Sequence, residues 1–450
     1  MKTFLFSLLI VTSFMGNAVA KKISYERSLN LLLKNIHPEG TVPGVVVASP
    51  SKSEPDYFYH WVRDAGLVMS TIFDVMEREQ NDIRKARLEG LMYEFAQRVK
   101  ENQEASGFWS LGEPKYHVDG APFTGPWGRP QHDGPALRAV TLIKFANYLI
   151  DQGQEDWVMD NLYTPILPAI SPIKMDLEYV ALHYDAQGFD YWEEVKGLHF
   201  STAMGQRRAL LSGAKLARRL NDPYAAEYYE AKANEVEKLI NKFWNPKKGY
   251  IESTLDQTRG VWKSQLDISV ILGVHHGDNG DTFFSPSDWR VMKTAAKIEE
   301  SFNRIYTINQ NTNDNLGTAI GRYPEDSYDG YRTDRLGNPW FLTTFAMAEY
   351  YLRLAKEVKS GKAGLHVGYY CKTLNLKECR TLKGSSNAVL APQFIKILNT
   401  KADSFFRRAD YHAGDFGHMD EQMNRNNGYM MGARDLTWSY AAHIQALIQR

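Results

Sequence analysis

The strongest constraint on the fold is a helical spacing of apolar residues that recurs along most of the chain. Apolar residues return every three or four positions, the period of a helix with one buried face, in these segments: Trp61–Met76, Ile83–Val99, Ala136–Leu149, Ala203–Leu220, Ala225–Phe243, Trp289–Ile305, Phe341–Val358, Val389–Phe406 and Leu436–Ile448. The alternation typical of strands is best in Val42–Ala48 and Tyr250–Thr254. We therefore expect an all-α protein.

Long polar loops rich in glycine and proline separate these helices, notably residues 107–133, 195–200, 306–338 and 411–434. Loops of this length inside a compact domain usually carry function. Helix pairs that alternate with such loops fit a closed toroid of helical hairpins with a site at one mouth. A solenoid is the alternative, but the sequence has no repeat of fixed period. No linker divides the chain, so we expect residues 21–450 to form one domain.

Composition and charge indicate which class of partner the protein binds. Of its 450 residues, 43% are hydrophobic and 24% are charged, which is typical of a globular protein with a sizeable core. The net charge is zero and the pI is about 7.2, so nothing attracts nucleic acid or an anionic membrane. Aromatic residues make up 12%, and their faces can bind the C–H faces of sugars. We expect a neutral partner and a monomer.

The N-terminus has the order of an export signal. Lys2 is followed by the apolar run Phe4–Phe14 and by the small-residue sequence Ala18-Val19-Ala20. The apolar run is too short to span a membrane. A buried first helix is the alternative interpretation. We expect residues 1–20 to be a signal peptide and the mature protein to be exported, either secreted or periplasmic.

Cys371 and Cys379 are the only cysteines. In an exported protein, a disulfide that closes this short loop is favoured over two free thiols. No histidine or second cysteine pair stands beside them at metal-ligand spacing. The segments His275-His276 and Asp278–Asp281 also lack a standard ligand order, and we interpret them as a solvated loop. We expect neither a metal nor a cofactor.

The segment Gly188–Val195 is the first candidate for chemistry. It places Asp190, Glu193 and Glu194 close together with Tyr191 and Trp192 between them. A carboxyl group against an apolar ring has its charged form disfavoured, so it can keep a proton to give to a leaving group. Glu193 beside Trp192 therefore suits a general acid. The alternative is a helix start whose acids complement the macrodipole.

Several other segments of the sequence also group polar and aromatic residues. Arg63-Asp64 follows the aromatic run Tyr57-Phe58-Tyr59, and this donor and acceptor pair can grip vicinal hydroxyls; a capping salt bridge is the alternative. Trp127 lies in a turn fixed by glycine and proline. The remaining clusters are Gly321–Tyr328, Asn338-Pro339-Trp340, Asp420-Glu421-Gln422 and Ala433–Tyr440.

Taken in order, these motifs resemble the glucoamylases of glycoside hydrolase family 15. The matching segments are Tyr57–Asp64, Trp127–Ala139, Trp192–Val195, Gly321–Asp326, Asn338–Trp340 and Ala433–Ala442. The resemblance covers the chain from about Tyr25 to its end. It implies an (α/α)6 barrel of six inner and six outer helices. It also implies release of β-D-glucose from the non-reducing ends of α-1,4-glucans such as starch, dextrins and glycogen, with some α-1,6 activity.

The resemblance also implies roles for single residues. Glu193 would be the general acid and Glu421 the general base that activates water. Inversion needs these two carboxyls about 6.5 to 9.5 Å apart. The residues expected to bind the sugar or to lie beside the water and the base are Tyr57, Arg63, Asp64, Trp127, Trp192, Glu194, Arg322, Tyr328, Trp340 and Trp438.

Some positions depart from the family pattern. His60 and Val62 stand where members often have small hydroxylated residues, and residues 331–337 lengthen the loop before Asn338, which points to different outer sugar sites. No starch-binding module follows Tyr440, so we expect soluble dextrins as substrates.

The rival functions are an α,α-trehalase or isomaltose-type α-1,6-glucosidase on the same barrel, and a glycan-binding protein without activity. The presence of both Glu193 and Glu421 argues against the latter.

Overall fold

The computed structural model describes residues 22–107, 110–310, 315–362, 364 and 366–450. The predicted signal peptide, residues 1–20, lies outside the described residues. Within the described part, no helix combines the length and the apolar character that crossing a membrane requires.

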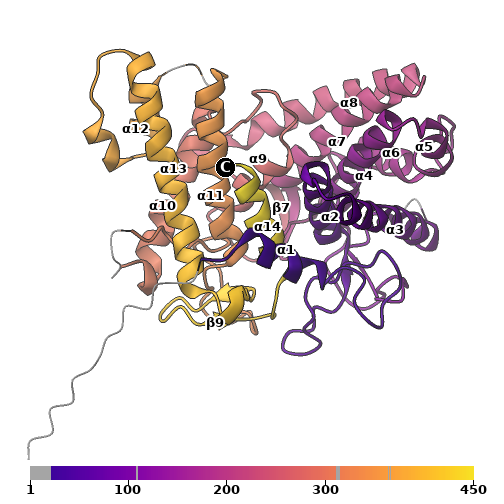
Figure 1. The fold of residues 1–450 in the computed structure, drawn as a ribbon, viewed down its shortest axis with the longest axis horizontal. Helices are drawn as coiled ribbons and strands as arrows, with labels where there is room; N and C mark the ends of the chain where they lie inside the picture. Colours follow the sequence, from indigo (N-terminus) through magenta and orange to yellow (C-terminus); the bar gives the residue numbers. More distant parts are fainter. Residues whose placement is uncertain (1–21, 108–109, 311–314, 363, 365) are drawn as a thin grey trace, which may run out of the picture.

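Six helices of the described chain form a closed ring, in which each packs against the next and the last packs against the first (Figure 1): α2 (Val62–Arg78), α4 (Asp133–Asp151), α7 (Phe200–Arg219), α9 (Ser269–His276), α11 (Phe341–Ser360) and α14 (Thr437–Ile448). The contact of α14 with α2 closes the ring, which excludes an open solenoid.

An outer helix packs against each inner helix: α3 (Asp82–Ser106) on α2, α6 (Pro172–His183) on α4, α8 (Pro223–Ile240) on α7, α10 (Trp289–Ile305) on α9, α13 (Asn387–His412) on α11, and α1 (Tyr25–Leu33) on α14. In Figure 1 the indigo helix α1 lies beside the yellow helix α14, so the first and last helices of the described chain meet. The predicted all-α (α/α)6 barrel is confirmed.

Inner and outer helices differ in how much of their surface is buried. In α11 every residue from Phe341 to Leu352 is buried, because this helix contacts neighbours on both sides and an outer helix behind. In α10 the buried residues form one stripe that includes Val291, Ala295, Ile298 and Phe302. Each predicted helical segment overlaps a helix, and α10 matches at both ends.

Three barrel helices, α1, α6 and α9, were not predicted from the sequence, and burial explains the cases of α9 and α6. Helix α9 is short and almost wholly buried, so no amphipathic period marks it. Helix α6 buries Lys174 and Asp176 among its apolar residues, which breaks the expected pattern. Two further short helices, α5 (Glu155–Asn161) and α12 (Val367–Thr373), were also not predicted.

The buried charges of α6 are paired with neighbouring elements. Arg138 of α4 donates to both oxygens of Asp176, from Nε at 2.8 Å and from Nη2 at 2.6 Å. Lys174 donates at 2.6 Å to Asp222, the N-cap of α8. Removing one partner of such a pair leaves an uncompensated buried charge at a cost of about 3–5 kcal/mol. These pairs fix α6 between α4 and α8.

The interpretation of His275–Asp281 as a solvated loop was wrong in part. His275 and His276 end α9, and His275 is buried with its Nε2 2.9 Å from the Ala346 carbonyl. Asp278 pairs with Arg353 and Asp281 pairs with Arg207, each at 2.7 Å. Within the described ranges, no group of histidine, cysteine and acidic side chains is arranged to hold a metal ion.

Short antiparallel strands join the loops before the inner helices. They are β1 (His60–Trp61) with β2 (Lys115–Tyr116), the sheet β3-β4-β7 (Gly188–Phe189, Val195–His199, Thr254–Gly260), β5 (Trp244–Asn245) with β6 (Tyr250–Ile251), and β8 (Gln422–Met423) with β9 (Met430–Met431). The predicted strand Tyr250–Thr254 is divided between β6 and β7. The predicted strand at Val42–Ala48 was wrong, since this segment makes a single bridge between Val46 and Ile36.

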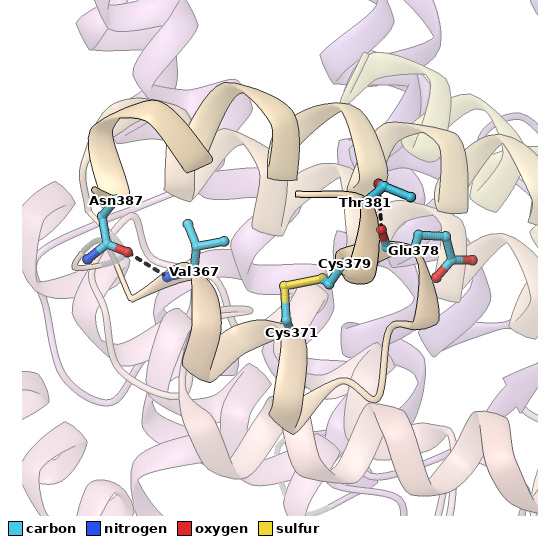
Figure 2. The surroundings of a disulfide bond; sticks show 6 residues. All are labelled: Val367, Cys371, Glu378, Cys379, Thr381 and Asn387. Carbon is cyan, nitrogen blue, oxygen red and sulfur yellow. Dashed lines mark hydrogen bonds between the residues drawn. A yellow bond between two sulfur atoms is a disulfide. The ribbon is translucent and has the colours of Figure 1, made fainter. Parts of the chain in front are cut away.

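Cys371 and Cys379 form the predicted disulfide, with the two sulfur atoms 2.07 Å apart (Figure 2). The bond joins α12 to the short 3-10 helix that follows it. Asn387, at the start of α13, accepts a hydrogen bond from the Val367 amide at 3.3 Å. This cross-linked segment packs on the outside of the barrel against α10 and α13.

The buried histidine His443 makes the stability of the barrel depend on pH. Its Nδ1 lies 2.7 Å from the Ser28 hydroxyl of α1, and its ring contacts Phe345 and Phe406. Burial lowers the pKa of His443 to about 3. In the unfolded chain this group binds a proton below about pH 6.5. The stability that the neutral, buried His443 side chain contributes is therefore present above about pH 6.5 and is lost as the pH falls.

We expect the free energy of unfolding to fall between pH 6.5 and pH 4, and His443→Gln to remove about 2 to 3 kcal/mol of that fall. Urea unfolding at several pH values measures this slope. The matched control is His366→Gln, which changes an exposed histidine. A slope in His443→Gln equal to that of the wild type would contradict the assignment.

Candidate active site

A pocket of about 350 Å3 lies at the end of the barrel where the inner helices begin. Its walls come from the loops that precede α2, α4, α7, α11 and α14 and from the first turns of α2, α11 and α14. All the residues that the sequence predicted for the site line this pocket: Tyr57, Arg63, Asp64, Trp127, Trp192, Glu193, Glu194, Arg322, Tyr328, Trp340, Glu421 and Trp438.

A second cavity, of about 190 Å3, lies between the inner helices toward their C-terminal ends. Its charged groups are largely matched to one another, as in the pairs Lys144–Asp74 and Arg353–Asp278, each at 2.7 Å. Trp438 lines both cavities and so forms part of the floor of the first. The convergent carboxyls and aromatic faces belong to the first pocket, which is the candidate active site.

A tight turn presents Glu193 to the pocket. Glu193 has a positive φ of 64°, and its amide donates to the Asp190 carbonyl at 2.9 Å. The Asp190 side chain accepts from the amides of Glu194 and Val195 at 2.8 and 2.9 Å. Burial raises the pKa of Asp190, but the Lys263 ammonium at 2.7 Å outweighs it, and the pKa is lowered to about 2. An ionised Asp190 therefore holds the turn.

The Glu193 carboxyl is surrounded by N–H donors. Oε1 accepts from Trp61 Nε1 at 2.9 Å and from Gln131 Nε2 at 2.8 Å, and Oε2 accepts from Trp127 Nε1 at 2.8 Å. Arg63 Nη2 lies 3.5 Å from Oε1. Trp192, which the sequence places beside this carboxyl, donates its indole N–H to Asp267 at 3.0 Å. Trp61 and Gln131 were not predicted as site residues.

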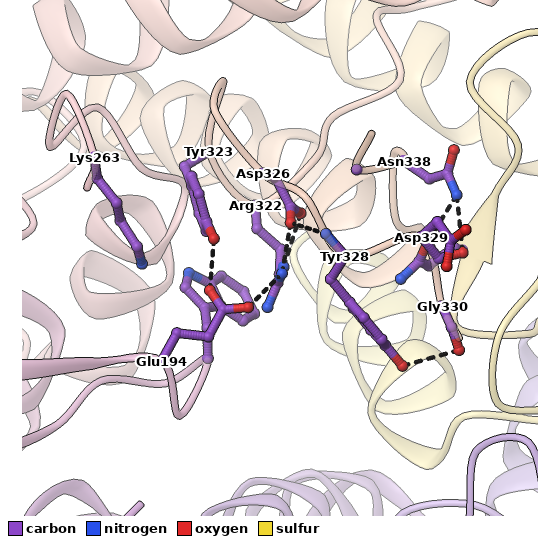
Figure 3. Close-up of polar contacts among 12 residues, drawn as sticks. Glu194, Lys263, Arg322, Tyr323, Asp326, Tyr328, Asp329, Gly330 and Asn338 are labelled. Carbon is purple, nitrogen blue, oxygen red and sulfur yellow. Dashed lines mark hydrogen bonds and ion pairs between the residues drawn. The ribbon is translucent and has the colours of Figure 1, made fainter. Parts of the chain in front are cut away.

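Glu194 belongs to a different network (Figure 3). Its carboxylate accepts from Arg322 Nη2 at 2.8 Å and from the Tyr323 hydroxyl at 2.6 Å. Arg322 is also held by Asp326, which accepts from its Nε at 2.8 Å and from its Nη2 at 2.6 Å. Burial raises the pKa of Glu194, and the Arg322 cation opposes this effect. The network fixes a cation and a carboxylate side by side on the wall of the pocket.

Arg63 and Asp64 are the second and third residues of α2, and both are buried. Arg63 Nη1 donates to Gln131 at 2.9 Å and to Asp133, the first residue of α4, at 2.8 Å. Its buried Nε has no hydrogen-bond partner among the described residues. Burial raises the pKa of Asp64 to about 6, although Arg63 lowers it. The substitutions His60 and Val62 leave this arrangement intact.

Glu421 precedes the β8–β9 hairpin and is fully buried. Its amide donates to the Ala433 carbonyl at 2.8 Å, and its Oε2 accepts from Gln422 at 3.3 Å. Oε1 has no hydrogen-bond partner in the described part of the chain. Burial raises the pKa of Glu421 to about 8, while the hydroxyls of Tyr57 and Tyr328 and the Arg322 cation lower it.

Aromatic rings form much of the pocket wall. Trp192 and Trp340 have ring centroids 5.9 Å apart, and Tyr328 lies 6.3 Å from Trp340. Trp127 is 40% exposed, so its face is available at the mouth. Thr333 brings the loop of residues 331–337 to the pocket lining.

Tyr191, Lys263 and Asp267 were also missed as parts of the site. Tyr191 lines the pocket and its ring lies 5.5 Å from the Arg63 guanidinium. Lys263 and Asp267 lie behind the wall, where Asp267 accepts from Trp192 and Lys263 pairs with Asp190. Tyr191 stood inside a predicted motif and could have been included. The two charged residues lie outside every motif, and only the fold brings them to the site.

Comparison with known proteins finds relatives along nearly the whole chain. The sequence model described as glycosyl hydrolases family 15 matches residues 26–448. The chain is 37% identical over 435 residues to a glucoamylase of Blastobotrys adeninivorans, covering 94% of this chain and 69% of that one. It is 36% identical over 420 residues to glucoamylase 1 of Rhizopus oryzae, covering 92% and 68%.

The solved structure of the Hormoconis resinae glucoamylase superposes with a TM-score of 0.82 at 33% identity, covering 95% of this chain and 72% of that one. The Hypocrea jecorina family 15 glucoamylase gives 0.80 at 31% identity, covering 94% and 70%. The family model spans nearly all the described residues and includes every residue of the candidate site. This chain therefore belongs to glycosyl hydrolases family 15.

Proposed function

We propose that this protein is an exo-acting, inverting glucoamylase that releases β-D-glucose from the non-reducing ends of α-1,4-glucans. Membership of family 15 and the similarity to glucoamylases support glucan hydrolysis. The observation that carries the mechanism is the placement of Glu193 and Glu421 on one pocket from distant segments. Inversion needs two carboxyls with room for a water between them.

Glu193 acts as the general acid in this proposal. It gives its proton to the glycosidic oxygen as the bond to the anomeric carbon breaks. The N–H groups of Trp61, Trp127 and Gln131 then stabilise the carboxylate that remains. These donors are in place before the reaction, so they stabilise the negative charge that develops on Glu193 in the transition state.

Glu421 acts as the general base. Its buried Oε1, which no described residue contacts by a hydrogen bond, suits acceptance of a proton from water. Because burial disfavours the ionised form, a Glu421 carboxylate in this site is a strong base. Tyr57 and Tyr328, whose hydroxyls are 3.0 Å apart, lie beside this carboxyl and orient the water.

The remaining residues bind the terminal glucose and its neighbour. Arg63 and Asp64 offer a donor and an acceptor to vicinal hydroxyls at the cleavage site. Arg322 and Glu194 offer a second donor and acceptor to hydroxyls next to the cleavage site. Trp127 and Trp340 supply flat faces for the next sugar. Trp438 and Tyr191 close the floor, which restricts cleavage to a chain end. The loop of residues 331–337 contributes to the outer sites through Thr333.

We further propose that the protein is exported and that residues 1–20 are removed. The N-terminal sequence pattern supports this proposal. The Cys371–Cys379 bond supports it independently, because disulfides persist in oxidising compartments.

The roles of the two carboxyls can be separated with two substrates. We expect Glu193→Gln to lower kcat on maltose by about a thousandfold, but activity on α-D-glucopyranosyl fluoride by less than about tenfold, because fluoride leaves with little acid assistance. Glu421→Gln should lose about a thousandfold on both, since water must be activated in each case. Glu230→Gln, on the exposed surface, is the control. Retention of a tenth of wild-type maltose activity by either variant would refute its role.

Tyr57→Phe should change the pH dependence of the reaction. The Tyr57 hydroxyl lowers the pKa of Glu421 against the effect of burial, so its loss raises that pKa. Since the base acts in its ionised form, the acidic limb of kcat/KM should move to higher pH. Tyr331→Phe, which changes an exposed tyrosine in the loop of residues 331–337, is the control. An acidic limb that stays in place would show that Tyr57 does not act on the base.

The mechanism also predicts the first product. With water attacking from the side opposite the leaving group, an α-linked substrate must release β-glucose. Proton NMR during the first minutes of maltotriose hydrolysis, before mutarotation, identifies the anomer. Initial α-glucose would rule out inversion, and larger fragments appearing first from maltoheptaose would rule out an exo-acting pocket.

A further inference from the structure

Lys115 places a buried ammonium group inside a cage of aromatic rings next to the pocket. Its side chain belongs to β2 and the residue is 2% exposed. The distances from Nζ to the ring centroids are 3.4 Å for Trp127, 4.2 Å for Phe123, 4.4 Å for Tyr59 and 4.5 Å for Trp61. An ammonium at these distances is attracted by the negative faces of the rings.

The rings are the main partners of this cation. The four ring centroids lie 3.4 to 4.5 Å from Lys115 Nζ, and the carboxylates of Glu193, Asp56 and Glu113 act on it through their charges. Burial lowers the pKa of Lys115 to about 8, although the charge of Glu193 raises it. A largely buried charge is costly, and the faces of the four rings offset part of that cost.

Two walls of the cage are the indoles that contact the proposed acid. Trp61 and Trp127 each donate Nε1 to the Glu193 carboxyl, one to each oxygen. Lys115 lies directly opposite Trp61 in the β1–β2 ladder. The two indoles meet edge to face, with centroids 6.1 Å apart, so a shift of one ring changes the position of the other. The ammonium lies over the faces of both rings, and its attraction to both faces ties their orientations together.

We propose that Lys115 is a positioning residue for the acid Glu193, because its ammonium holds the Trp61 and Trp127 indoles with both N–H groups aimed at that carboxyl. The inference rests on the proposed role of Glu193 as the acid. Lys115 is assigned no contact with the substrate. Its effect passes through the two indoles and through its charge.

The test compares maltose with α-D-glucopyranosyl fluoride as substrates of Lys115→Met. The leaving sugar of maltose needs the proton of Glu193, whereas fluoride leaves with little acid assistance. We expect kcat/KM on maltose to fall about tenfold, mainly through kcat, because aromatic positioning by the cation is lost. Activity on the fluoride should stay within about twofold of the wild type.

The Michaelis constant gives a second readout. A residue that positions the acid acts mainly in the transition state, so KM for maltose should change little in Lys115→Met while kcat falls. The other charged groups near the acid or the lysine are unchanged in the variant: Arg63, Asp64, Asp133, Asp56, Arg129 and Glu113.

Two further variants complete the comparison. Lys52→Met is the matched control, since Lys52 Nζ lies 4.2 Å from the Phe58 ring on the exposed surface, and it should leave both activities unchanged. Lys115→Arg keeps a cation in the cage and should recover part of the maltose activity. Equal losses on the two substrates in folded Lys115→Met, or no loss on either, would overturn the inference.

Glu193→Gln separates this inference from the proposed function. If Glu193→Gln discriminates between the two substrates and Lys115→Met does not, the role of Lys115 is wrong and the acid role stands. If Glu193→Gln also fails to discriminate, the acid role and this inference are both overturned. Should Lys115→Met not fold, Lys115→Gln takes its place, and failure of both to fold would assign Lys115 to the fold alone and overturn the proposal.

Discussion

The common direction of the six inner helices is the constraint on which the site depends. Because each inner helix begins at the same end of the ring, every loop that precedes one lies at that end. Helix N-termini carry a partial positive charge that stabilises carboxylates nearby. Asp64 lies in the first turn of α2 and Asp133 begins α4. The ring thus gathers acidic side chains and loop aromatics at one mouth.

Burying so many charges at that mouth requires that each has a partner. Arg322 is held by Asp326 and Glu194, and Lys263 is held by Asp190. Removing one member would leave a charge without compensation, at a cost of several kcal/mol. The pairs therefore contribute rigidity more than net stability, and a rigid site holds donors where charge develops in the transition state.

Much of the fold and of the candidate site could be predicted from the sequence, for reasons that differ from one element to the next. Helix α10 has one apolar stripe against a polar face, so its period gave both of its ends. Helix α9 is buried all round and helix α6 buries ion pairs, so neither showed a period. The site residues were identified by family motifs, and all of them line one pocket. Trp61 and Gln131 stand inside two of these motifs but were given no role, because only the fold shows that their N–H groups reach Glu193. The fold likewise decides that the Trp192 indole donates to Asp267.

The surroundings of the two carboxyls differ in the opposite sense to the one the sequence indicated, and this difference suits inversion. N–H donors surround Glu193 and stabilise it once its proton has left, whereas burial of Glu421 favours its protonated form. In an inverting turnover the acid ends ionised and the base ends protonated. Both environments therefore match the state after proton transfer, so each transfer is favoured in the forward direction. With Glu193 as the proposed acid and Glu421 as the proposed base, the next turnover requires that Glu193 regain a proton and Glu421 lose one, so this mechanism depends on the exchange of protons with water between turnovers.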